Sequence, residues 1–336
     1  MQVDLCLDAR LPASELLKLG LAAEAAGLGT IWLASYIAGR DAFANLVPLA
    51  QASSRIRLGP VAVNPYDSHP VRIATGLLTL NEFAQGRARI VVGGGGEALQ
   101  ALGLPPERRP RAVGECVQII KGADPSRPFN FAGQMYRVNG WQPAWVTSSV
   151  PPVMVAANKP QMLRMAARYA DGVMLSDLPP AICRERIGWV EAHRREFSRE
   201  SLPFSYSNFL AWHVYRDRER ARREARQWLG FRGLFRPWVV TTFMSAADSA
   251  IIEAHKADIY AMPVLGTDRV PGVPDQLLDQ LVDELTLCGD YSDVPRLIRH
   301  LLAMRAAGVT EVCLEIREDA LETIRILGEQ VAPALA

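Results

Sequence analysis

Short apolar runs alternate with amphipathic runs along the chain, and this alternation constrains the fold more than any other feature. Strands are expected at 3–7, 30–34, 56–63, 88–92, 153–157, 173–176, 204–215 and 311–316. Helices are expected after them at 13–26, 42–52, 70–83, 109–120, 160–169, 179–197, 217–229 and 319–331. Strands that alternate with helices form a parallel α/β sheet with both faces covered. Eight such units favour a closed (β/α)8 TIM barrel over an open sheet.

The chain is longer than a bare barrel requires. It has 336 residues, against roughly 250 for a barrel without insertions. Length alone would fit two domains or one large barrel, but no linker interrupts the eight units. We therefore expect a single domain, 1–336, with an insertion or lid at 231–305 between strands seven and eight. We also expect a hairpin at 129–138, before the fifth strand.

Charge and cysteine usage exclude several classes of partner. Lys+Arg is 37 and Asp+Glu is 36, and this balance argues against nucleic acid as a partner. No apolar stretch reaches the length of about 18 residues that a membrane span needs, and no signal peptide is visible. The five cysteines form no CxxC pair, so we expect buried, reduced thiols and a cytoplasmic protein. No histidine shows metal-ligand spacing, so no metal site is expected.

The active site of a TIM barrel lies at the carboxyl ends of its strands. This rule selects the following positions: Asp8, Arg10, Ser35, Tyr36, 61–66, 93–97, 156–159, Ser176 and Asp177. Among them, Gly93, Gly94, Gly95 and Gly96 directly follow the fourth strand. Without side chains, a flat ring or a phosphate can approach the backbone N–H groups there. A flexible loop without a ligand is the alternative interpretation.

Several short motifs at these strand ends resemble one known family. They are Ala23-Glu24-Ala25-Ala26-Gly27, the strand at 31–36, Arg57-Leu58-Gly59, Leu80-Asn81-Glu82, the glycine loop at 93–97, Ala156-Ala157-Asn158-Lys159-Pro160 and Ala170-Asp171-Gly172. In this order they resemble the luciferase-like monooxygenase superfamily of flavin- and deazaflavin-dependent barrel enzymes. Asn64-Pro65-Tyr66 with His69-Pro70 resembles the methylenetetrahydromethanopterin reductase branch, which uses the deazaflavin coenzyme F420.

The resemblance implies a set of cofactor-binding positions. A non-proline cis peptide is expected at Val61–Ala62, as a bulge that supports the ring. Further contacts are implied at the ends of the second to fifth strands: Ser35, Asn64, Gly93, Gly94, Gly95, Gly96, Ala157, Asn158 and Lys159.

Two residues are candidates for proton transfer. The sugar-phosphate dehydrogenases of the family carry an Asp-His pair where this chain has Ser35-Tyr36, so that route of alcohol oxidation is not implied. A reductase needs a proton donor beside its hydride donor, and Glu97 or Tyr36 could serve. Tyr36 could instead be a packing aromatic, and Glu97 an acid favoured by a helix N-terminus.

The resemblance implies an oxidoreductase that transfers a hydride between F420 and a small organic substrate and acts as a reductase. It also implies a homodimer. An FMN-dependent monooxygenase is the first alternative. A barrel that binds a flavin without turnover is the second. Apolar side chains of the insertion could form a substrate wall or simply pack: Phe231, Phe235, Trp238, Phe243 and Met244.

Overall fold

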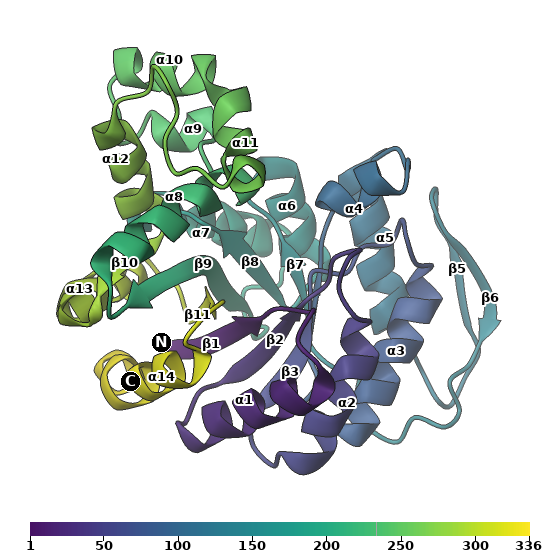
Figure 1. The fold of residues 1–336 in the computed structure, drawn as a ribbon. Helices are drawn as coiled ribbons and strands as arrows, with labels where there is room; N and C mark the ends of the chain where they lie inside the picture. The colour runs from purple at the N-terminus through teal and green to yellow at the C-terminus, as the bar shows by residue number, and fades with distance from the viewer. Residues whose placement is uncertain (233) are drawn as a thin grey trace.

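Eight parallel strands form a barrel at the centre of the computed structural model, which describes the chain apart from residue 233 and the side chains of residues 97 and 98 (Figure 1). In barrel order these strands are β1 (Gln2–Leu7), β2 (Thr30–Ala34), β3 (Arg57–Val61), β4 (Ile90–Val92), β7 (Val153–Ala156), β8 (Gly172–Ser176), β9 (Ser205–Tyr215) and β11 (Glu311–Glu315). Strand β1 pairs with β11, and bridges Leu58–Ala88 and Val63–Val92 join β3 to β4. The predicted (β/α)8 barrel is confirmed.

Helices surround the barrel, each packed against the next. They are α1 (Ala13–Ala25), α2 (Ala42–Ala52), α3 (Pro70–Phe83), α5 (Arg109–Lys121), α6 (Pro160–Tyr169), α7 (Pro180–Glu196), α13 (Val294–Ala306), and α14 (Ala320–Ile326) with α15 (Ala332–Leu335) after a π-helical turn at Leu327–Val331. Local sequence signals explain where several of these helices begin or end. Gly27, with a φ of +75°, follows α1, and His69 caps α3 by accepting a hydrogen bond from the backbone N–H of Val71.

The long connection between β9 and α13 leaves the barrel. It contains α8 (Arg218–Arg232), α9 (Pro237–Val240), α10 (Ala246–Ala254), α11 (Lys256–Leu265), α12 (Asp275–Leu285) and β10 (Leu287–Asp290). Helices α9 to α12 form a lobe beside the barrel, at the upper left of Figure 1. Strand β10 pairs with β9, while α13 packs against α7 and α15 in the helix ring. The division of the chain into one domain with an insertion at 231–305 stays a prediction.

Two smaller elements complete the fold. Strands β5 (Phe129–Ala132) and β6 (Arg137–Trp141) pair antiparallel, which confirms the expected hairpin. A short helix, α4 (Gly96–Ala101), follows the glycine loop. The two chain ends meet, since the N-terminal ammonium of Met1 donates a hydrogen bond to the backbone oxygen of Leu335.

The core lies inside the barrel and between the barrel and its helices. All three residues of β4 and ten consecutive residues of β9 are buried, as expected for strands covered on both faces. All five cysteines are buried and free, as predicted. In the part of the chain that the structure describes, no helix is long and apolar enough to cross a membrane.

A buried ionic network lies at the amino-terminal end of the barrel strands. The Arg89 guanidinium lies 3.0 Å from the Glu311 carboxylate and 3.9 Å from that of Asp4. Trp32 donates a hydrogen bond from Nε1 to Asp4. Burial raises the pKa of Asp4 to about 7, and the neighbouring Glu311 adds to this effect. In TIM barrels this end serves stability rather than catalysis.

Candidate active site

A cavity of about 520 Å³ opens at the carboxyl ends of the barrel strands. Eight of the positions that the strand-end rule selected line it: Asp8, Arg10, Ser35, Tyr36, Val61, Ala62, Ala156 and Ser176. Ala156 and Met174 add small and apolar surface from β7 and β8. The rule that active sites lie at the strand ends therefore selected part of a real cavity.

The peptide bond between Val61 and Ala62 is cis, as the resemblance implied. The Val61 carbonyl accepts a hydrogen bond of 2.7 Å from the backbone N–H of Ser35, so the ends of β2 and β3 are joined at this point. A Cβ atom on Gly93 would lie 3.0 Å from the Cβ of Ala62. The missing side chain at Gly93 thus lets the end of β4 pack closely beside the cis peptide.

Several other predicted positions contribute to the frame around the cavity. The Asn64 amide donates to Asp67 over 2.6 Å, and its oxygen accepts the Tyr66 N–H over 3.0 Å, which closes a turn after β3. Asn158 and Ser176 exchange two hydrogen bonds of 3.0 and 3.1 Å between the ends of β7 and β8.

The remaining predicted positions are not among the residues that line the cavity. Ala157 is buried, whereas Lys159 is exposed and directly precedes α6. Gly94 accepts a hydrogen bond from Arg109 through its backbone oxygen. The backbone of Glu97 lies in α4, and its side chain lies outside the described part of the structure.

An acidic side chain at the end of β1 organises one wall. The Asp8 carboxylate forms an ion pair of 2.6 Å with Arg10 and accepts a hydrogen bond from the Tyr36 hydroxyl. Burial alone would raise the pKa of Asp8, but the hydrogen bonds from Arg10 and Tyr36 outweigh it and lower that pKa to about 2. Burial and the bond to Asp8 raise the pKa of Tyr36 to about 12. Near neutral pH this wall therefore holds a carboxylate and a neutral phenol.

A second charged group joins the end of β8 to the connection that carries the lobe. The buried Asp177 carboxylate lies 2.9 Å from the Arg232 guanidinium and accepts a hydrogen bond of 2.5 Å from the Ser176 hydroxyl. Arg236 donates to the backbone oxygen of Ser176 over 3.0 Å. The Arg232 guanidinium also lies over the Phe209 ring, 4.6 Å from its centroid.

The sequence interpretation missed the end of the eighth barrel strand. Glu315, the last residue of β11, lines the cavity together with Arg317. The Arg317 guanidinium lies over the ring of Trp228, 4.1 Å from its centroid. Burial raises the pKa of Glu315 to about 7 against the opposing charges of Arg232 and Arg317. The strand-end rule would have found both residues if it had been applied to 311–316.

The predicted insertion contributes less to the cavity wall than its aromatic content suggested. Phe231 lines the cavity, and half of its surface is exposed. Phe235 and Met244 are buried, and Trp238 and Phe243 pack against the core. Among the residues that the structure describes, no group of three or more His, Cys, Asp or Glu side chains is placed to hold a metal ion.

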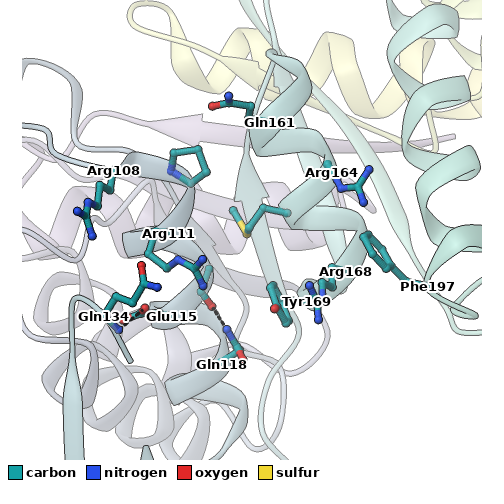
Figure 2. A pocket seen from close by; sticks show the side chains of 13 residues that line it. Arg108, Arg111, Glu115, Gln118, Gln134, Gln161, Arg164, Arg168, Tyr169 and Phe197 are labelled. Atoms are coloured by element: carbon teal, nitrogen blue, oxygen red, sulfur yellow. Dashed lines mark hydrogen bonds between the residues drawn. The ribbon is translucent and has the colours of Figure 1, made fainter. Parts of the chain in front are cut away.

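A separate cavity of about 430 Å³ lies outside the barrel, between α5 and α6 (Figure 2). Arg108 and Arg111 lie on one side of it, and Arg164 and Arg168 on the other. Its Glu115 carboxylate accepts backbone N–H groups from 134–136, which ties α5 to the hairpin turn. No strand end is among the residues that line this cavity, so the cavity at the barrel mouth is the candidate active site.

A closed barrel with charged side chains around a cavity at its strand ends defines a TIM-barrel enzyme. Residues 2–311 match the model of one family, the luciferase-like monooxygenases. The chain therefore belongs to the luciferase-like monooxygenase family.

Known proteins of similar sequence and structure agree with this assignment. The chain is 26% identical to the 5,10-methylenetetrahydromethanopterin reductase of Archaeoglobus fulgidus over an alignment of 321 residues. The alignment covers 93% of each of the two chains. The fold of this protein is similar to that of the coenzyme F420-dependent tetrahydromethanopterin reductase of Methanopyrus kandleri, with a TM-score of 0.82, 20% identity and coverage of 100% and 99% of the two chains. It is also similar to an F420-dependent secondary alcohol dehydrogenase in complex with an F420-acetone adduct, with a TM-score of 0.80, 18% identity and the same coverage.

Proposed function

We propose that this protein is an oxidoreductase that transfers a hydride between coenzyme F420 and a small organic substrate, as a reductase. The observation that carries the proposal is the make-up of the cavity at the strand ends. Val61, Ala62 and Ala156 line it with small side chains suited to a flat ring, and Arg10, Arg232 and Arg317 place three guanidinium groups in the same lining, beside the carboxyl groups of Asp8 and Glu315. The similar tetrahydromethanopterin reductase and secondary alcohol dehydrogenase are both F420-dependent, which supports F420 as the coenzyme.

The residues present fit a flat, acidic coenzyme. Any side chain at Gly93 would press on Ala62, so this small-residue lining depends on a glycine there. Guanidinium groups suit the phosphate or carboxylate groups of an acidic coenzyme tail. The other predicted contacts remain part of the proposal: Ser35, Asn64, Gly94, Gly95, Gly96, Ala157, Asn158 and Lys159. When bound, the deazaflavin would supply the hydride chemistry, and the protein would position it and exclude water.

Tyr36 and Glu97 are proposed as groups that act on the proton. Tyr36 lines the cavity, and its hydroxyl hydrogen bond to Asp8 fixes the direction of its ring. Glu97 follows the glycine loop at the start of α4. We further propose a cytoplasmic homodimer; the five free, buried thiols support a reducing compartment.

Two other functions on the same fold are kept as alternatives: an FMN-dependent monooxygenase and a barrel that binds a flavin without turnover. To test the proposal, the oxidation of reduced F420 is measured with two candidate substrates, 5,10-methylenetetrahydromethanopterin and acetone. The first is the compound that the similar reductase is named for, and the second is part of the adduct bound to the similar dehydrogenase. We expect turnover in the wild type and a loss of roughly 10²-fold or more in Glu97→Gln, with F420 affinity kept. The exposed Glu329→Gln is the control. Binding of F420 without turnover of either compound would favour the non-catalytic alternative.

A further inference from the structure

Glu315 presents a carboxyl group without a hydrogen-bond partner to the active-site cavity. Its side chain is 13% exposed, and it lines the cavity at the end of β11. Within the described residues its oxygens accept no hydrogen bond, and the ion pair of its carboxylate is with Nε of Arg317, at 3.6 Å. A buried carboxylate without hydrogen bonds is costly, so burial favours the protonated form.

The charged groups around Glu315 come from four different parts of the fold. Arg317 follows β11, and Arg232 ends α8; both favour the carboxylate. Asp177 after β8 and Asp8 after β1 favour the protonated form. Desolvation is the largest effect, and the pKa of Glu315 rises to about 7. Around neutral pH this group can therefore both hold a proton and release it.

The same cavity contains a second carboxyl group with the opposite behaviour. Asp8 is bound by Arg10 and Tyr36, which lower its pKa to about 2, so it stays ionised. The raised pKa of Tyr36, about 12, makes its hydroxyl a weak acid near neutral pH. Two carboxyl groups whose surroundings push their pKa values apart are a recurring pattern of acid and base assignment in enzymes.

We propose that Glu315 is a further catalytic residue, beside the candidates Tyr36 and Glu97, and that it gives a proton to the heteroatom of a substrate bound in this cavity and takes it back in the reverse direction. This inference rests on the proposed function. In the reductive direction a C=O or C=N bond of the substrate is reduced. A bound reduced deazaflavin would supply the hydride to its carbon, and its oxygen or nitrogen would receive the proton of the Glu315 carboxyl group. The O–H bond of Glu315 breaks, and the remaining carboxylate regains a proton from water.

The protonation state of Glu315 is tested first in the full-length protein without coenzyme. Infrared difference spectra across pH 7 report the carbonyl stretch of protonated carboxyl groups. The carboxyl group of Asp4 titrates in the same pH range, so the part of the carbonyl signal that is lost in Asp4→Asn is assigned to Asp4. We expect Glu315→Gln to remove a further part, and the exposed Glu318→Gln to leave the spectrum unchanged. An unchanged spectrum in Glu315→Gln would overturn the inference.

The catalytic role is tested with reduced F420 and the same two compounds. We expect Glu315→Gln to lower kcat/KM by roughly 10²- to 10⁴-fold with the F420 dissociation constant unchanged, and to remove the decline of activity above pH 7. Glu315→Asp should restore part of the rate and the pH dependence, while Glu318→Gln should match the wild type. A wild-type rate and pH profile in Glu315→Gln would contradict the inference. Absence of F420 binding to the wild type would instead contradict the proposed function.

Discussion

The fully buried carboxylate of Asp177 lies 2.9 Å from Nη2 of Arg232, and this pair fastens α8 to the end of β8. Arg236, further along the same connection, lies 3.8 Å from the same carboxylate. Both arginines belong to the long connection that carries the lobe, and Arg232 also lines the cavity. The Asp177 carboxylate therefore joins the end of β8 both to the cavity wall and to the connection that carries the lobe.

Replacing Asp177 should destabilise the protein strongly. Asp177→Asn leaves the Arg232 guanidinium with no carboxylate at that position, and breaking a buried pair in this way costs about 3–5 kcal/mol. We expect a loss of this size in the free energy of unfolding, measured in urea. Glu329→Gln breaks the exposed pair with Arg325 and should cost less than about 1 kcal/mol. Equal losses in the two variants would show that the buried pair does not hold α8 in place.

A methyl group at Gly59 should disturb the closure of the barrel. A Cβ atom there would lie 1.9 Å from the backbone oxygen of Arg89, where β3 meets the chain that leads into β4. Backbone cannot move aside as a side chain can, so we expect Gly59→Ala to cost about 3 kcal/mol or more. In α7, Gly188 has no atom within 4 Å of the corresponding Cβ position, and Gly188→Ala should stabilise by about 0.5–1 kcal/mol. Thermal unfolding of the two variants measures both changes in stability. A Gly59→Ala protein as stable as the wild type would refute the close contact between Gly59 and Arg89.

The Asp4 carboxyl group should make the protein less stable as the pH rises. Its pKa is raised by burial from 3.8 to about 7, so between these values the folded state binds more protons than the unfolded state. The contribution of Asp4 to stability is then complete below pH 3.8 and is lost as the pH rises through 7. We expect Asp4→Asn to reduce this loss, measured as the urea midpoint at several pH values.

Asp8 provides the opposite case and serves as the control. Its pKa is lowered to about 2, so its contribution is present above pH 3.8 and is lost as the pH falls towards 2. Asp8→Asn should therefore change the acid limb of the stability profile and leave the range between 3.8 and 7 as in the wild type. If Asp4→Asn kept the wild-type slope in that range, the raised pKa of Asp4 would be wrong.

Much of the barrel could be predicted because its signals are local. Most barrel strands are short apolar runs, and glycines such as Gly27 end helices where a positive φ is needed. Tyr36 could be placed at the site because it lies two residues after a strand whose direction is fixed by the barrel. Its partner Asp8 lies 28 residues away, and their hydrogen bond exists only because the ends of β1 and β2 are neighbours.

Contacts between distant segments could not be predicted from single motifs. The Glu24 carboxylate, in the motif at the end of the first helix, accepts backbone N–H groups from Ser54, Arg55 and Ile56 just before β3. Arg232 reaches the cavity because α8 packs across β9 and β10, which depends on the folded lobe. Neither residue type nor spacing carries that information, because it comes from tertiary packing.

The central claim is that the cavity at the strand ends binds F420 rather than FMN. Spectral titration of the ligand-free wild type with each coenzyme tests this most directly, with Gly93→Val as a variant that fills the space beside Ala62. The account predicts saturable binding of F420, at least tenfold weaker binding in Gly93→Val, equivalent to about 1.4 kcal/mol, and no binding of FMN at the same concentrations. Tight binding of FMN together with no binding of F420 would contradict it.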